Sequence, residues 1–161
     1  MSHQTVIVLD FGGQYNQLIA RRVRECNVYC EVKPYTTPLA ELKAMDPIGI
    51  IFTGGPNSVY LDDSPHVDSD IFTWGVPILG ICYGCQLMAH ALGGQVTEAQ
   101  DDSAREYGKT QTYYDTACKL FHGLPAQGIS WMSHGDYMAK VPEGFALVAH
   151  SDACPNVAIA D

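Results

Sequence analysis

A cysteine, Cys82, stands where a predicted strand meets a predicted helix. It lies within Gly-Ile-Cys-Tyr-Gly, after the apolar run 76–81 and before the helix predicted for residues 85–92. Flanking glycines allow a cramped turn, and the partial positive charge of a helix N-terminus favours a thiolate over a thiol. Such a strand–nucleophile–helix corner exposes a reactive side chain. The position indicates a nucleophile, with an inert buried cysteine at a strand end as the alternative.

Three other segments carry groups that such a nucleophile would need. Gly54 and Gly55 follow a predicted strand at 48–53 and can turn backbone N–H groups toward an oxyanion, or form an ordinary loop. Gln86 lies one helical turn after Cys82 and can point toward the same cleft. A polar group suited to substrate recognition or to a turn follows another apolar strand: Ser133, His134, Gly135 and Asp136.

Cys82 and Cys85 also form a CxxC pair at a helix N-terminus, which is the arrangement of a thioredoxin-like redox site. The flanking Gly80 and Gly84 instead favour a corner that exposes one nucleophile. A thiol oxidoreductase is therefore the weaker alternative.

The hydrophobic pattern predicts an α/β fold: a doubly wound, mostly parallel sheet with helices on both faces. Strands are predicted at 6–9, 28–32, 48–53 and 76–81, with helices at 15–26, 39–45, 67–74 and 85–92. Gly93 and Gly94 should stop the last helix. Shorter, partly antiparallel strands follow at 107–114, 129–132, 145–149 and 156–160. Parallel topology would bring Asp10, Gly54 and Cys82 to one sheet edge, where ligands bind.

Composition excludes several classes of protein. The 161 residues form about one domain, and a formal net charge of −9 argues against a nucleic-acid partner. No apolar run is long enough to span a membrane, and no signal peptide is apparent, so we expect a cytoplasmic protein with six reduced cysteines. The cysteine and histidine spacing supplies no convincing zinc site, so we predict no metal.

Taken together, the motifs resemble the class I glutamine amidotransferases, most closely the amidotransferase domains of GMP synthases. The motifs that carry the resemblance are AspPheGlyGlyGlnTyr (10–15), GlnLeuIleAlaArgArgValArgGlu (17–25), GlyGlyPro (54–56), GlyIleCysTyrGlyCysGln (80–86), ArgGluTyrGly (105–108) and TrpMetSerHisGlyAsp (131–136). The resemblance implies a flavodoxin-like amidotransferase fold over residues 1–161.

The resemblance also implies a glutaminase. Cys82 would attack the side-chain amide of L-glutamine, backbone N–H groups of Gly55 and Tyr83 would bind the oxyanion, and Gly54, Gln86 and residues 133–136 would bind the substrate. The ammonia would pass to an ATP pyrophosphatase domain or subunit, which would use ATP and Mg²⁺ to aminate XMP to GMP. We expect no cofactor in the amidotransferase domain itself, and the complete enzyme is expected to be a homodimer.

One departure concerns the general base. The family uses a His followed by Pro and Glu, and none of the six histidines here has that context. His90 lies eight residues beyond Cys82, or about 12 Å along a helix, which is too far. We therefore expect a domain truncated before its His-Pro-Glu segment, with little turnover by these residues alone. A non-catalytic glutamine-binding or docking subunit of the same fold is the other alternative.

Overall fold

The computed structural model describes residues 3–100 and 105–161. The chain forms two compact units, Met1–Met88 and Ala89–Asp161, which we describe in turn.

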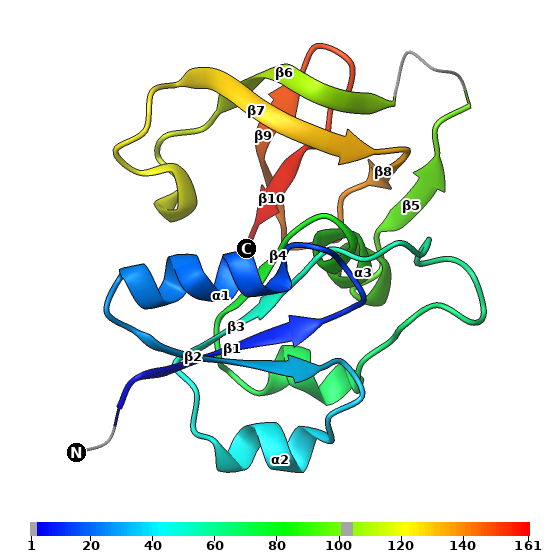
Figure 1. Cartoon of the computed structure of the whole chain (residues 1–161). Coiled ribbons are helices and arrows are strands. Elements are labelled where there is room, and N and C mark those ends of the chain that lie inside the picture. Colours follow the sequence, from blue (N-terminus) through cyan, green and yellow to red (C-terminus); the bar gives the residue numbers. More distant parts are fainter. Residues whose placement is uncertain (1–2, 101–104) are drawn as a thin grey trace. The chain divides into compact units, whose positions relative to one another are not determined.

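The first unit contains a four-stranded, entirely parallel sheet in the order β2-β1-β3-β4 (Figure 1). The strands are β1 (Thr5–Asp10), β2 (Tyr29–Pro34), β3 (Gly49–Phe52) and β4 (Ile78–Gly80). Their carboxyl ends lie at one edge, because Asp10 pairs with Pro34 and Phe52 pairs with Gly80. This confirms the predicted parallel α/β sheet, and it brings the segments that follow β1, β3 and β4 to the same edge.

Helices cover both faces of this sheet (Figure 1). On one face α1 (Asn16–Glu25) buries Ala20 against Val8 and Cys30, with Val23 packed beside them. On the other face lie α2 (Leu39–Ala44) and a short 3-10 helix, η1 (Ser69–Thr73). Leu9, Leu42 and Ile71 line a small pocket on that side. Both layers follow from strands whose side chains alternate between two buried faces.

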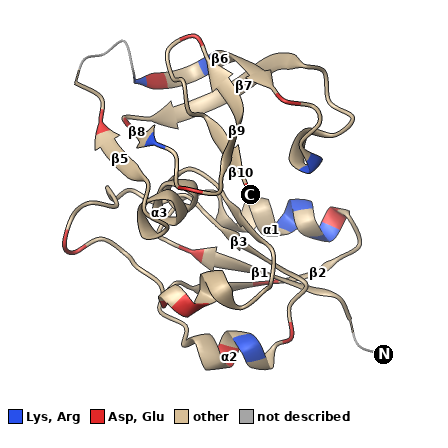
Figure 2. Ribbon diagram, turned by 180° about the vertical axis from the view of Figure 1, so that it is seen from behind, with Lys and Arg blue, Asp and Glu red and all other residues tan. Residues whose placement is uncertain are grey.

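The basic residues of α1 lie on its solvent-facing side. Arg21 and Arg22 have side chains that are more than two-thirds exposed, and both pair with Glu25 at 3.2 and 2.7 Å. Figure 2 shows this mixture of charges along α1. Exposed pairs of this kind contribute little to stability, so the cluster is a solvated helix face.

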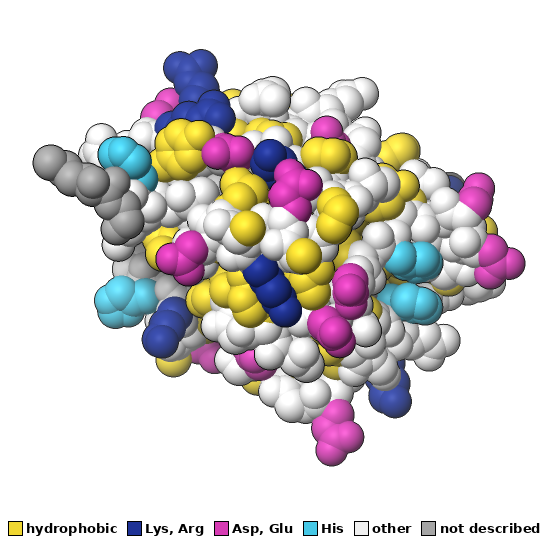
Figure 3. All heavy atoms as spheres, turned by 90° about the horizontal axis from the view of Figure 1, so that it is seen from below, with side chains coloured by type: hydrophobic (Ala, Val, Ile, Leu, Met, Phe, Trp, Pro, Cys, Tyr) yellow, Lys and Arg dark blue, Asp and Glu magenta, His cyan; other side chains and the backbone are white. Residues whose placement is uncertain are grey.

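The α2 side of the first unit also mixes charged and apolar groups. Lys43 lies 5.8 Å from the centre of the Trp74 ring. In the view from below, hydrophobic side chains lie between charged ones (Figure 3).

The helix predicted for residues 67–74 is shorter than expected. The structure forms only the five-residue 3-10 helix η1 there, and Ile71 is its one buried residue.

Helix α3 (Tyr83–Ala91) is separated from β4 by the two residues Ile81 and Cys82, and its start packs closely on β3. The N–H of Gly84 donates to the carbonyl of Thr53 at 3.0 Å. A Cβ atom at Gly84 would collide with the backbone and the side chain of Phe52. The helix ends as predicted: Gly93 has a φ of +91°, and the N–H of Gly94 donates to Ala89 at 2.8 Å.

The second unit is built from short antiparallel strands, as the sequence predicts for this half of the chain. A four-stranded sheet has the order β10-β9-β6-β7, and β5 pairs with β8 in a separate ribbon. The elements are β5 (Gln95–Glu98), β6 (Glu106–Tyr114), η2 (Lys119–Phe121), β7 (Gln127–His134), β8 (Asp136–Lys140), β9 (Ala146–Ser151) and β10 (Ala158–Ala160). Strands β5 and β8 were not predicted.

Among residues 3–100 and 105–161, none of the helices combines the length and the apolar character that crossing a membrane requires.

The contact between α3 and β3 predicts a large cost for adding one methyl group. Gly84→Ala should lower the free energy of unfolding by about 2 kcal/mol or more, because the new Cβ meets backbone that cannot move away. Gly49→Ala is the matched control, since a Cβ there would meet only the Pro77 carbonyl at 3.8 Å. Urea unfolding followed by circular dichroism measures both changes. Equal stability of the two variants would contradict this packing.

Candidate functional site

Cys82 has a strained backbone conformation, with a φ of +54°. L-residues rarely adopt this left-handed region, and such strain gathers at functional sites. Strand β4 ends at Gly80 and α3 begins at Tyr83, so Cys82 occupies the corner between them. Its carbonyl accepts the N–H of Gln86 at 3.0 Å, which makes Cys82 the N-cap residue of α3. The side chain of Cys82 is exposed.

The corner depends on a close approach at Gly80. A Cβ atom at Gly80 would lie 2.7 Å from both the backbone nitrogen and the Cα of Cys85. Only glycine therefore allows the end of β4 to pass this close to the first turn of α3. Together with Gly84, it provides the glycine frame that the sequence indicates on both sides of Cys82.

Gly54 lies beside the thiol. A Cβ atom built on it would be 3.5 Å from the Cβ and 3.8 Å from the Sγ of Cys82. The neighbouring Gly55 approaches the carbonyl of Phe11 so closely that a Cβ, at 2.5 Å, could not fit. In the described part of the chain, the N–H of Gly55 donates to no other backbone group. The loop after β3 thus places a glycine backbone next to Cys82.

The side chain of Tyr83 is buried in the first unit, whereas its backbone N–H lies at the start of α3. The ring is buried and lies 5.6 Å from that of Phe11, and the hydroxyl donates to the carbonyl of Pro65. Burial raises the pKa of this hydroxyl, so it remains a hydrogen-bond donor. The backbone N–H is the first of α3 and has no partner within the helix. It is a donor at the corner occupied by Cys82.

Cys85 differs from Cys82 in its surroundings. Burial, followed by the proximity of Cys82, raises the pKa of the Cys85 thiol to about 11. The group is therefore protonated at neutral pH and is a weak nucleophile. Among the described residues, all six cysteines are present and none forms a disulfide.

The remaining predicted residues fall in both units. Gln86 lies on the first turn of α3 and is partly exposed. Ser133 and His134 end β7, Gly135 is a single connecting residue, and Asp136 begins β8. The structure therefore brings Gly54, Gly55, Tyr83 and Gln86 to the Cys82 corner, and it collects residues 133–136 at one junction of the second unit.

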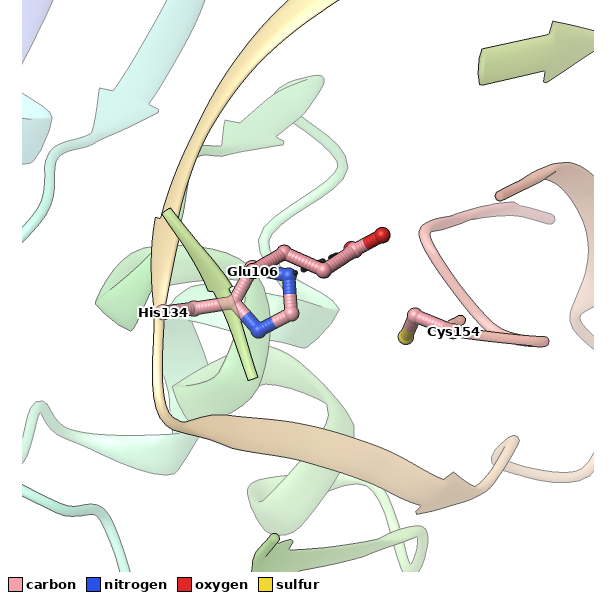
Figure 4. A group of neighbouring side chains, drawn as sticks. All are labelled: Glu106, His134 and Cys154. Atoms are coloured by element: carbon pink, nitrogen blue, oxygen red, sulfur yellow. Dashed lines mark hydrogen bonds and ion pairs between the residues drawn. The ribbon is translucent and has the colours of Figure 1, made fainter. Parts of the chain in front are cut away.

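A buried group that the sequence analysis missed surrounds His134 (Figure 4). Its Nε2 lies 2.9 Å from a carboxylate oxygen of Glu106, which is 5% exposed. The Sγ of Cys154 completes a set whose candidate ligand atoms all lie within 4.8 Å of one another. Burial is the main cause that raises the pKa of the Cys154 thiol. Glu106, His134 and Cys154 are widely separated in the sequence, so no local pattern predicts that their side chains meet.

Comparison with known proteins gives a consistent result. The family model for Glutamine amidotransferase class-I matches residues 7–161. The chain is 59% identical over 154 residues to the "GMP synthase [glutamine-hydrolyzing]" of Clostridium perfringens, and 60% identical over 154 residues to that of Caldicellulosiruptor saccharolyticus. Each alignment covers 96% of this chain and 30% of the relative, so the chain spans about three tenths of the length of these curated relatives.

Two solved structures share the fold. A "putative gmp synthase subunit a protein" from Thermoplasma acidophilum has a TM-score of 0.84 at 28% identity, covering 99% of this chain and 79% of that one. A glutamine amidotransferase from Thermotoga maritima has a TM-score of 0.77 at 20% identity, covering 99% and 72%, and this likeness supports the fold alone. With the family model matching nearly its whole length, the chain belongs to the class-I glutamine amidotransferase family.

Proposed function

We propose that this chain hydrolyses glutamine through Cys82 and supplies the ammonia for the synthesis of GMP. The observation that carries the proposal is the conformation of Cys82, held at a φ of +54° between β4 and α3 with the Gly54 backbone beside its thiol. Because the chain belongs to the amidotransferase family, we assign glutamine hydrolysis to the Cys82 corner. Identities of 54–60% to proteins named GMP synthase support GMP synthesis as the use of the ammonia.

The reaction proceeds through a covalent intermediate. The Sγ thiolate of Cys82 attacks the side-chain amide carbon of glutamine, and a tetrahedral oxyanion forms. Collapse of this species breaks the C–N bond, and the nitrogen leaves as ammonia after gaining a proton. Water then attacks the γ-glutamyl thioester, releasing glutamate and restoring the thiol.

We assign the oxyanion to the backbone N–H groups of Gly55 and Tyr83. Both residues adjoin the nucleophile in chain or in space, and neither N–H is used in the local backbone hydrogen bonding described above. A donor in this role is typically worth about 3 kcal/mol in the transition state. We further propose that Gly54, Gln86 and residues 133–136 recognise the substrate, with the carboxylate of Asp136 suited to the α-ammonium group.

The acceptor of the ammonia lies outside these residues. As the partner we propose an ATP pyrophosphatase domain or subunit, which binds ATP and Mg²⁺ and aminates XMP. The relatives are named glutamine-hydrolysing GMP synthases and are about three times longer than the matched region, which supports such a partner. We also propose a cytoplasmic location and a homodimer for the complete enzyme.

The general base is the part of the mechanism that we do not assign to these 161 residues. No histidine in the chain is followed by Pro and Glu. We propose that Cys82 of this amidotransferase domain binds and reacts with glutamine, but that residues 1–161 turn it over slowly because they contain no His-Pro-Glu sequence.

A glutamine-shaped chloroketone should alkylate Cys82 with loss of chloride, and added glutamine should slow this reaction by competing for the site. Cys82→Ala should abolish the label, which peptide mass mapping detects. Labelling that falls elsewhere, or that glutamine does not slow, would contradict the proposed function.

The reactivity of Cys85 distinguishes a single nucleophilic cysteine from a redox pair. Because the pKa of Cys85 is about 11, its alkylation by iodoacetamide should accelerate about tenfold per pH unit between pH 7 and 10. Cys85→Ser should leave glutamine-protected labelling of Cys82 within about twofold of wild type. Loss of that labelling in Cys85→Ser, together with disulfide reductase activity in the wild type, would favour the thiol oxidoreductase.

A general base typically contributes about a hundredfold to ten-thousandfold, so residues 1–161 should release ammonia slower by that factor than a glutaminase with its His-Pro-Glu segment. A coupled glutamate dehydrogenase assay measures the rate, with Cys82→Ala as the blank. Ammonia release at an ordinary glutaminase rate would refute the missing base.

A further inference from the structure

Glu106 is a buried carboxylate held between three strands. One oxygen lies 2.9 Å from Nε2 of His134 on β7, and the other accepts the hydroxyl of Ser151 at the end of β9. Ser151 in turn accepts the N–H of Cys154 at 2.9 Å. Burying a carboxylate is costly unless its oxygens are hydrogen-bonded, and both oxygens of Glu106 are. Both oxygens of Glu106 are thus used in hydrogen bonds, one to His134 and one to Ser151.

The strand register makes the Glu106–His134 contact specific. In the antiparallel pair of β6 and β7, Glu106 stands directly opposite His134. Strand β6 also pairs with β9, which carries Ser151. A one-residue slip of either pair would turn the side chain to the other face of the sheet. The contact is therefore set by the sheet and not by a flexible loop.

A single hydrogen bond, to Glu106, orients the imidazole of His134. Its Nδ1 is buried and has no hydrogen-bond partner among the described residues, so the ring is oriented through Nε2 alone. The side chain of His134 is 16% exposed and that of Glu106 is 4% exposed. Because a carboxylate accepts, the Nε2–H donates, and Nδ1 keeps its lone pair in the neutral tautomer. Removal of Glu106 would leave the ring without a fixed orientation.

The chain changes direction immediately after His134. It leaves the four-stranded sheet there, passes through Gly135 alone, and enters the β5–β8 ribbon at Asp136. The carbonyl of Gly135 accepts the N–H of Ala99 at 3.0 Å, and Asp136 pairs with Glu98. The far side of the junction is therefore held by β5, and its near side is held by the pairing of β7 with β6 and by the Glu106–His134 contact.

We propose that Glu106 is a positioning residue, which fixes the imidazole of His134 and through it the backbone of residues 133–135 for recognition of the amino-acid end of glutamine. This inference rests on the proposed function, which assigns residues 133–136 to substrate binding. Glu106 does not touch the substrate. It acts by holding the residues that do, so its loss should weaken glutamine recognition without changing the intrinsic reactivity of Cys82.

The same residues must be weighed as a metal site, because glutamate, histidine and cysteine are all zinc ligands. One observation favours positioning. Nε2 of His134 and one oxygen of Glu106 are already hydrogen-bonded to each other, and the other oxygen of Glu106 accepts the hydroxyl of Ser151.

The test compares two alkylating reagents at Cys82 in the chain of residues 1–161. The measured quantity is the ratio of the rate for a glutamine-shaped chloroketone to the rate for iodoacetamide. Glu106→Gln should lower this ratio about threefold to tenfold, because the amide keeps an acceptor oxygen but loses the charge. Glu106→Ala should lower it about tenfold to a hundredfold. Iodoacetamide rates should stay within about twofold of wild type in both variants.

Two comparisons separate positioning from general stability. Thr112→Val, at a residue 1% exposed on the same strand, is the control and should leave the ratio unchanged. If Glu106 acts through His134, then adding Glu106→Gln to His134→Ala should change the ratio by less than about twofold, since coupled residues are not additive. Glu106→Gln and His134→Ala decide the outcome if Glu106→Ala does not fold.

Three results would overturn the proposal: an unchanged ratio in Glu106→Gln and His134→Ala, additive effects in the double variant, or equal slowing of both reagents. A stoichiometric zinc ion in the purified protein that is lost in Glu106→Gln would also overturn it, by assigning the cluster to metal binding. A wild-type chain with no preference for the glutamine-shaped reagent is a different result, because it removes the proposed function itself.

Discussion

The left-handed backbone at Cys82 is the constraint on which the first unit depends. Holding a non-glycine residue there costs of order 1–3 kcal/mol, so the surroundings must over-determine it. Hydrogen bonds do so on both sides: the N–H of Ile81 donates to Phe52 at 2.9 Å, and that of Gly84 donates to Thr53 at 3.0 Å. Phe52 is the last residue of β3 and Thr53 follows it, so the end of this strand fixes the backbone on both sides of Cys82.

Burial of aromatic rings offsets this strain. Phe11, Phe52 and Tyr83 are each no more than 2% exposed, and the Phe11 ring lies 5.4 Å and 5.6 Å from the other two. They come from the segment after β1, from β3 and from the first turn of α3. Rings in such contact contribute beyond the area that they bury. The cluster thus ties together the chain segments that surround the thiol.

Sequence reasoning succeeded where the signal was local. Glycine-framed Cys82 and the apolar strands before it were enough to predict the corner and the parallel sheet. It missed β5 and β8, because each buries a single apolar side chain, Val96 or Met138, and has no alternation to detect. It also missed Glu106, whose partners lie 28 and 45 residues away and become neighbours only through strand register. The shortened helix at η1 likewise reflects a segment with one buried residue.

The central claim is that this corner makes Cys82 an acyl acceptor, and a trapped intermediate tests it most directly. Residues 1–161 would be mixed with glutamine labelled in its carbon chain, quenched in acid within seconds and digested for mass spectrometry. The account predicts a labelled γ-glutamyl thioester on the Cys82 peptide that hydroxylamine removes and that Cys82→Ala lacks. Labelled glutamate formed without any adduct on Cys82, or an adduct on another residue, would contradict it.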